Sequence, residues 1–176
     1  MVTGIERPGA VTLRGNPITL LGPEVKVGQK APDFTLVGQG FKPFALKDFK
    51  GKVKVLLSVV SLDTPVCATE TQKFNQMAAT LPPDVQVLVI SMDLPFAQAR
   101  WCGAQGVDKV TALSDFQHRQ FGPAYGVLRK DTGLHARAAF VVDKEDVVRY
   151  VEYVKEIATE PNYDAIREAV REIAGA

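Results

Sequence analysis

The sequence predicts an α/β protein with a central mixed β-sheet flanked by helices and an added β-hairpin at its N-terminal end. Three observations support this prediction. Two continuous apolar runs, at residues 53–60 and 85–92, have the composition of strands that are buried on both faces. Segments with helical periodicity alternate with these strands. Near the amino terminus, an alternating pattern surrounds the turn signal Gly15-Asn16-Pro17.

Size and charge limit the classes of protein to consider. The 176 residues suit one domain, residues 1–176, with a sizeable core. A net charge of +1 gives no electrostatic case for binding nucleic acid or a membrane surface. There is no long apolar run and no secretory signal pattern, so we expect a cytoplasmic protein. In a reducing compartment its two cysteines are more often free, metal-bound or catalytic than permanently bonded.

The first half of the chain is expected to contain a hairpin, a loop region, a buried strand and a helix. The hairpin should cover about residues 10–22, and one short strand should follow near residues 34–36. The strand at residues 53–60 leads into a helix whose buried positions recur at spacings of three and four. These positions are Cys67, Thr71, Phe74, Ala78 and Leu81.

The second half continues the alternation. A short helix is expected over residues 95–103, ending at Gly103, and a third strand over residues 110–114. A further helix is expected between Asp115 and Gln120.

The last part of the chain predicts two strands joined by a tight turn, at residues 135–143 and 146–154, and then an amphipathic helix over residues 161–174. No linker divides the chain. Strands that alternate with helices and close with a hairpin and a helix follow the order of a thioredoxin-like α/β fold.

One of the two cysteines lies at the predicted start of the first long helix. Thr64 is a favoured N-cap residue and Pro65 suits the first helical position, so Cys67 falls in the first turn. Asp63 as the cap would shift the register by one residue and leave Cys67 in the same turn. Unpaired amides and the helix dipole stabilise a thiolate there. The alternative is a cysteine that is simply buried as a small hydrophobic residue.

Ionisation alone does not make a fast nucleophile. A free thiol is about 3% thiolate at pH 7, so complete ionisation gains roughly 30-fold, or ~2 kcal/mol. Donors that align the substrate are also required, and the Thr64 hydroxyl is one candidate. Arg137 is another, because it shares a strand face with apolar residues, where an unpaired charge is costly. Glu70, one turn beyond Cys67, is a candidate partner for Arg137, and the alternative is that Glu70 is a solvated helix residue. For Arg137, a purely structural ion pair is the alternative.

The second cysteine, Cys102, lies far along the chain, and no C-x-x-C motif occurs. The pair is therefore not the dithiol of a thioredoxin-type reductase. A nucleophilic cysteine with a distant partner suits a thiol that is oxidised to sulfenic acid and then captured as a disulfide. Cys102 as an inert core residue is the alternative. His118 and His135 do not form a zinc spacing with the cysteines, so we expect no metal and no other cofactor.

Several motifs occur in an order that resembles the thiol peroxidase subfamily of the peroxiredoxins. They are SLDTPVCATETQKFN, ARWCGAQGV, ARAAFVVD and EIATEPNYD. The N-terminal VTLRGNPITLLGPEVKVGQKAPDFTL is similar to the hairpin and following loop of that subfamily. The likeness therefore covers nearly the whole chain.

This resemblance implies a role for each site residue. Cys67 would be the peroxidatic cysteine and Cys102 the resolving one, joined in an intramolecular disulfide during the cycle. Thr64 would hydrogen-bond the thiolate and orient the peroxide, and Arg137 would stabilise the thiolate and polarise the O–O bond. The resemblance further implies hydrogen peroxide and organic hydroperoxides as substrates, thioredoxin as the reductant, a role in antioxidant defence, and a homodimer.

The chain departs from the family pattern at one position. The family has a proline seven residues before the peroxidatic cysteine, which shields the thiolate, and this chain has Val60. Valine keeps the apolar cover but not the rigid backbone. We expect activity to survive, and the rate and the substrate range are the properties that the change would affect.

Two other functions compete with a peroxidase. A general thiol-disulfide oxidoreductase would need no peroxide, but the absence of C-x-x-C argues against it. A thioredoxin-fold binding or chaperone module would have cysteines that react slowly with peroxide. For the peroxidase, we expect the reduced protein to hold the two sulfurs too far apart to bond, with the first turn around Cys67 unfolding on oxidation.

Overall fold

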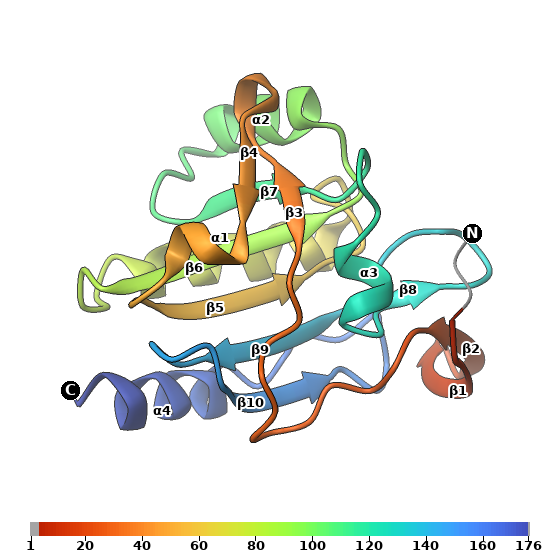
Figure 1. Cartoon of the computed structure of the whole chain (residues 1–176). Helices are drawn as coiled ribbons and strands as arrows, with labels where there is room; N and C mark the ends of the chain where they lie inside the picture. Colours follow the sequence, from red (N-terminus) through yellow and green to blue (C-terminus); the bar gives the residue numbers. More distant parts are fainter. Residues whose placement is uncertain (1–3, 176) are drawn as a thin grey trace.

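A computed structural model of the protein describes residues 4–175, which form a larger and a smaller β-sheet with four α-helices (Figure 1). In spatial order, the larger sheet consists of β10 (Val148–Tyr153), β9 (Ala138–Val142), β5 (Val53–Ser58), β6 (Val85–Ser91), β7 (Thr111–Ser114), β3 (Thr35–Val37) and β4 (Pro43–Ala45). The β5–β6 and β6–β7 pairs are parallel and the others antiparallel. The predicted mixed sheet is therefore confirmed.

The two faces of the larger sheet carry different layers. Helices α1 (Pro65–Ala78) and α4 (Tyr163–Ala174) pack on one face, where they meet alternate residues of the central strands, such as Val55 and Leu57. Every residue of β5 is buried, as the continuous apolar run predicts for a strand covered on both sides. Helix α2 (Pro95–Gln105) lies beside β7 at the edge of this layer.

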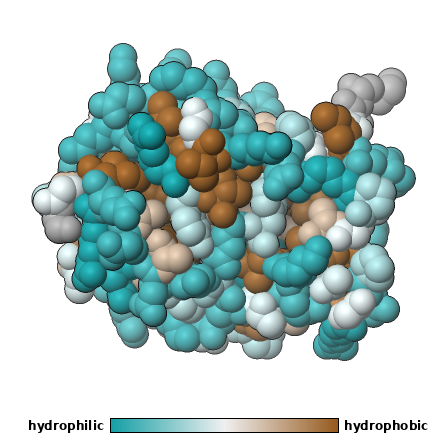
Figure 2. Space-filling model, turned by 90° about the horizontal axis from the view of Figure 1, so that it is seen from below, coloured by the Kyte–Doolittle hydropathy of each residue, from teal (hydrophilic) through white to brown (hydrophobic). Residues whose placement is uncertain are grey.

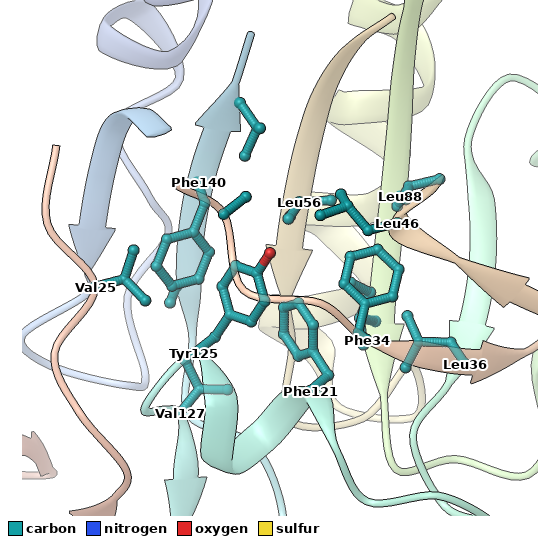
Figure 3. Packing of buried hydrophobic residues seen from close by; sticks show 14 of the residues in the cluster. Val25, Phe34, Leu36, Leu46, Leu56, Leu88, Phe121, Tyr125, Val127 and Phe140 are labelled. Atoms are coloured by element: carbon teal, nitrogen blue, oxygen red, sulfur yellow. The ribbon is translucent and has the colours of Figure 1, made fainter. Parts of the chain in front are cut away.

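The opposite face is covered by a cluster of aromatic rings. The rings of Phe121 and Tyr125 stack with centroids 4.3 Å apart, and Figure 3 shows them between Phe34 and Phe140. The Tyr125 hydroxyl donates a hydrogen bond to the Pro32 carbonyl at 2.8 Å. Helix α3 (Phe121–Ala124) and the loop before β3 are thereby fixed to the sheet.

The N-terminal hairpin is present and forms the smaller sheet with one later strand. It consists of β1 (Glu6–Leu13) and β2 (Asn16–Leu21), and β8 (Leu128–Arg129) pairs with β2. The hairpin begins earlier than the expected residue 10, with a register shift near Gly9. Arg14 and Gly15, both with positive φ, form the turn, as a two-residue hairpin connection requires. The predicted turn signal was therefore displaced, because Asn16 and Pro17 already belong to β2.

Two further sequence predictions were wrong in detail. Helix α2 continues through Gly103 and ends where Gly106 adopts a left-handed conformation, since glycine is tolerated inside a helix and the left-handed residue is the effective stop. The helix expected between Asp115 and Gln120 is instead a turn. The Asp115 carboxylate accepts bonds from the amides of Gln120, Phe121 and Gly122, so the helix begins only at Phe121.

The surface is mostly polar on the face shown in Figure 2, where apolar residues form separate patches. Among residues 4–175, none of the helices is both long enough and apolar enough to cross a membrane.

Two glycines with similar backbone conformations provide a test of the close contact between the end of the hairpin and helix α3. Gly22 (φ 104°) and Gly28 (φ 95°) both lie in the left-handed region. A Cβ at Gly22 would sit 2.0 Å from the Pro123 carbonyl oxygen, whereas a Cβ at Gly28 would meet no described atom within 4 Å. We expect both alanine variants to lose about 1–2 kcal/mol from backbone strain. Gly22→Ala should lose a further ~1–3 kcal/mol, because the two segments must separate.

Urea unfolding of both variants measures this difference in the free energy of unfolding. Equal losses for Gly22→Ala and Gly28→Ala would show that the close approach of the Pro123 carbonyl has no energetic consequence.

Candidate active site

The site lies where β5 leads into α1, at the carboxyl ends of the parallel strands β5 and β6. Thr64 is the N-cap of α1, with an extended backbone (φ −88°, ψ 143°), and Pro65 is the first helical residue. This is the predicted register, and it places Cys67 in the first turn. The Cys67 side chain is completely buried.

Asp93 fixes the loop that precedes this helix. Its carboxylate accepts hydrogen bonds from the Ser61 hydroxyl at 2.7 Å and from the Leu62 amide at 2.9 Å. The Ser91 hydroxyl is a third donor, at 2.8 Å. No sequence motif points to Asp93. The available signal was its position just after β6, because loops that follow neighbouring parallel strands meet at one edge of the sheet.

The Thr64 hydroxyl points toward the loop that precedes the helix. It donates a hydrogen bond to the Ser61 carbonyl at 2.9 Å and does not accept a bond from the amides of the first turn. Those amides therefore remain free of a side-chain cap. To donate to a thiolate at Cys67, the hydroxyl must first rotate away from Ser61, because it has a single hydrogen.

Arg137 is the buried cation of the site. It directly precedes β9 and is 2% exposed. Its Nε donates to the Ile157 carbonyl at 3.0 Å, and its Nη1 donates to Glu70 in a buried ion pair, as the sequence predicted. Burial lowers the pKa of Arg137, but the charge of Glu70 and the interactions with Cys67 outweigh this effect and leave the pKa raised. The guanidinium therefore stays charged beside the sulfur.

Glu70 only partly neutralises this cation. Burial raises the pKa of Glu70 to about 7, against the opposing effect of Arg137, and the negative charges of Glu152 and Glu160 raise it further. One of its carboxylate oxygens, Oε1, has no hydrogen-bond partner among the described residues. Near neutral pH, Glu70 therefore exists in both the charged and the neutral form.

Cys102 lies in α2 and is half-buried. It borders a groove of about 330 Å³ that is also lined by Phe44 and Gln98. Burial raises the pKa of the Cys102 thiol. Cys102 and its neighbour Trp101 pack against the apolar cluster that contains Cys67, and both cysteines are free.

Val60, the position that departs from the family pattern, is half-buried between two apolar clusters. It packs against the cluster that contains Cys67 and also against the cluster under the hairpin. The apolar cover expected of valine is therefore present.

The structure brings together Cys67, Glu70 and Arg137, with Thr64 at the cap of the same helix and Cys102 at the edge of the same apolar cluster. Within residues 4–175, no group of three or more His, Cys, Asp or Glu side chains is arranged to hold a metal ion.

A thioredoxin-like sheet with an isolated cysteine at a helix start, beside a buried arginine, is the arrangement of a thiol redox protein. Residues 26–166 match the Redoxin family, to which this chain therefore belongs.

Curated relatives place it among the thiol peroxidases of that family. It is 51% identical over 156 residues to the thiol peroxidase of Oceanobacillus iheyensis, covering 89% of this chain and 94% of that protein. It is 50% identical over 161 residues to the thiol peroxidase of Bacillus subtilis, covering 92% of this chain and 96% of the relative.

A solved structure supports the same relationship. The peroxiredoxin-like protein from Aquifex aeolicus superposes with a TM-score of 0.89 at 46% identity, covering 97% of this chain and 99% of that chain. A thiol peroxidase from Chromobacterium violaceum superposes with a TM-score of 0.83 at 24% identity, covering 92% and 95% of the two chains, which bears on the fold alone.

The titration of Glu70 should be visible in the reactivity of the site. Above about pH 7 Glu70 is ionised and offsets the charge of Arg137, and below it the carboxyl is neutral. We expect the rate of reaction with hydrogen peroxide to carry an inflection near pH 7, which Glu70→Gln removes. Above pH 7 the variant should react faster than the parent by up to about tenfold, equivalent to ~1.4 kcal/mol, because the charge of Arg137 is no longer offset.

Stopped-flow rates between pH 5 and pH 9 measure this effect. Because the pKa of Glu70 is raised from 4.5 to about 7 by folding, its contribution to stability is full below pH 4.5 and is lost as the pH rises through 7. Glu70→Gln should therefore also flatten the pH dependence of unfolding in this range. Glu6→Gln is the control, because Glu6 is an exposed carboxylate paired with Lys130 and is not among the charges that act on Glu70. An inflection that persists in Glu70→Gln would assign the titration to another group.

Proposed function

We propose that this thiol peroxidase reduces hydrogen peroxide and organic hydroperoxides to water and alcohols through Cys67, with Cys102 as the resolving cysteine. The observation that carries the proposal is the buried Arg137 guanidinium, which interacts with Cys67 at the start of α1. Thiol peroxidase is also the name of the relatives that are about half identical to the chain.

In the first step, the Cys67 thiolate attacks one oxygen of the hydroperoxide. An S–O bond forms as the O–O bond breaks, and the other oxygen leaves with a proton as water or alcohol. Cys67 becomes a sulfenic acid. Arg137 stabilises the thiolate and the negative charge that develops on the leaving oxygen. The Thr64 hydroxyl, after rotating from Ser61, orients the peroxide.

In the second step, the Cys102 sulfur attacks the sulfenic sulfur. An S–S bond forms, the S–O bond breaks, and the hydroxyl leaves with the thiol proton as water. Because burial raises its pKa, Cys102 remains a thiol at neutral pH and does not compete with Cys67 for peroxide. Cys67 is fully buried, so the first turn of α1 must open for the two sulfurs to meet.

The disulfide must then be reduced. A dithiol protein such as thioredoxin supplies the two electrons and two protons, and its own cysteines become the disulfide. The cytoplasm suits this cycle, because it keeps such dithiols reduced. In the net reaction, the hydroperoxide is reduced and the dithiol of thioredoxin is oxidised. The removal of hydroperoxide is an antioxidant activity.

We propose that the enzyme is a homodimer, and an exposed aromatic patch offers a face for it. The patch consists of the exposed Phe41 and Phe96 and the half-buried Phe116, and the ring centroid of Phe41 lies 5.3 Å from that of Phe96 and 5.9 Å from that of Phe116, edge-on in both cases. Phe96 is 68% exposed, although it is a large apolar side chain. Sedimentation should give a dimer for the parent and a monomer for Phe96→Asp. A parent that sediments as a monomer would contradict the proposal.

Trp101, the only tryptophan, adjoins Cys102 and reports the chemistry. We expect one equivalent of hydrogen peroxide to change its fluorescence rapidly and to consume two thiols per chain. Cys67→Ser should abolish the response, because no sulfenic acid forms. Cys102→Ser should still react with peroxide, but it should stop at the sulfenic acid and should not turn over with thioredoxin.

Stopped-flow fluorescence and thiol titration provide these measurements, and steady-state turnover with hydrogen peroxide and a bulky alkyl hydroperoxide compares the substrates. If Cys67→Ser responds and Cys102→Ser does not, the two roles are reversed. Slow reaction of both thiols in the parent would favour a binding module without turnover.

A further inference from the structure

The turn of the N-terminal hairpin is bound to a single carboxylate from the other end of the chain. The Glu156 side chain accepts hydrogen bonds from the amides of Arg14 at 2.9 Å and Gly15 at 3.1 Å. The Thr12 hydroxyl donates to the same carboxylate at 2.8 Å. Both turn residues have positive φ, which directs their amides toward one acceptor.

These bonds keep Glu156 charged under all ordinary conditions. The amides of Arg14 and Gly15 and the hydroxyl of Thr12 lower the pKa of Glu156 to about 2. Its contribution to folding is present above its usual value of 4.5 and is lost only as the pH falls toward 2. The hydrogen bonds from the hairpin turn to Glu156 form a clamp. Because Glu156 stays ionised, this clamp is unchanged across the pH range in which a peroxidase is assayed.

The backbone on either side of Glu156 is also bound to the hairpin. The Thr12 amide donates to the Lys155 carbonyl at 2.7 Å, and the Ile157 amide donates to the Thr12 carbonyl at 2.8 Å. Next to these backbone hydrogen bonds, apolar side chains of the hairpin pack against Ile157 and against Ala136 and Val60. Ala136 precedes Arg137 directly. The hairpin therefore supports two of the segments that form the active site.

The Ile157 carbonyl links this clamp to the reacting groups. It accepts the bond from Arg137 Nε at 3.0 Å, while Nη1 of the same guanidinium is bound to Glu70. Because a guanidinium is planar and rigid, two fixed donors define the direction of the remaining ones. A shift of the Ile157 carbonyl would therefore rotate the guanidinium, which interacts with Cys67.

We propose that Glu156 is a positioning residue of the peroxidase: by holding the hairpin turn, it fixes the Ile157 carbonyl and hence the Arg137 guanidinium beside Cys67. The inference rests on the proposed function, in which Arg137 acts on the thiolate and the peroxide. It gives the N-terminal hairpin a role in the chemistry, although none of the hairpin residues belongs to the catalytic group.

The test compares two reactions of Cys67 in single-turnover experiments. Reaction with hydrogen peroxide needs the oriented guanidinium, whereas alkylation by the neutral reagent iodoacetamide does not need peroxide alignment. We expect Glu156→Ala to slow the peroxide reaction by about tenfold, since small misplacements of aligning groups are costly, and to slow alkylation much less. Glu156→Gln and Thr12→Val each keep part of the clamp and should show smaller losses in the same direction.

A double mutant with Arg137 distinguishes a positioning role of Glu156 from a general effect of Glu156 on stability. In an Arg137→Met background, Glu156→Ala should cause no further loss of the peroxide rate. Glu6→Gln is the matched control, because Glu6 joins the same hairpin to Lys130 through an exposed ion pair. It should react like the parent.

An equal loss in both backgrounds, or equal slowing of peroxide reaction and alkylation, would overturn the inference and leave Glu156 a structural residue. If Glu156→Ala does not fold, parent-like peroxide rates in Glu156→Gln and Thr12→Val would overturn it as well. Failure of the proposed function looks different, because Arg137→Met itself would then leave the peroxide rate unchanged.

Discussion

The site depends on one buried cation. A guanidinium removed from water is costly unless its charge is balanced and its donors are bonded, and Arg137 meets this condition with groups from separate parts of the chain. Glu70 comes from α1, and the Ile157 carbonyl comes from the segment between β10 and α4. The fold must bring these segments together before the arginine is stable. The same arrangement places the guanidinium beside Cys67, so in the proposed mechanism stability and reactivity have a common origin.

Burial of Cys67 creates a second constraint, because in the proposed cycle the sulfur must later reach Cys102. The first turn of α1 suits a local opening, since Thr64 does not cap its amides and such a cap typically contributes about 1 kcal/mol. Asp93 holds the preceding loop through Ser61 and Leu62, so the opening can be confined to the turn itself. The loop before α1 is therefore anchored by Asp93, whereas the first turn of α1, which contains Cys67, is held less strongly.

Sequence patterns predicted the parts of this arrangement that depend on local chemistry. Thr64 and Pro65 set the helix start, and the expense of an isolated Arg137 implied Glu70 as its partner. Contacts between distant segments were not predictable in this way. Asp93 and the Ile157 carbonyl act through loop geometry, and a carbonyl carries no signal in the sequence. The sequence at Asp115 wrongly predicts a helix that starts there, because a carboxylate that caps a helix and one that binds amides five residues later cannot be distinguished from the sequence.

The rate constant for oxidation of Cys67 by hydrogen peroxide in Arg137→Met tests the central claim most directly. We expect a loss of about 100-fold or more, the usual effect of removing one preorganised donor from a developing charge. Arg129→Met is the matched control, because Arg129 is also buried and paired with a carboxylate, Asp131, but lies in β8. It should retain the parent rate if it folds. A parent-like rate in Arg137→Met would show that the buried guanidinium is structural and that the reactivity of Cys67 has another source.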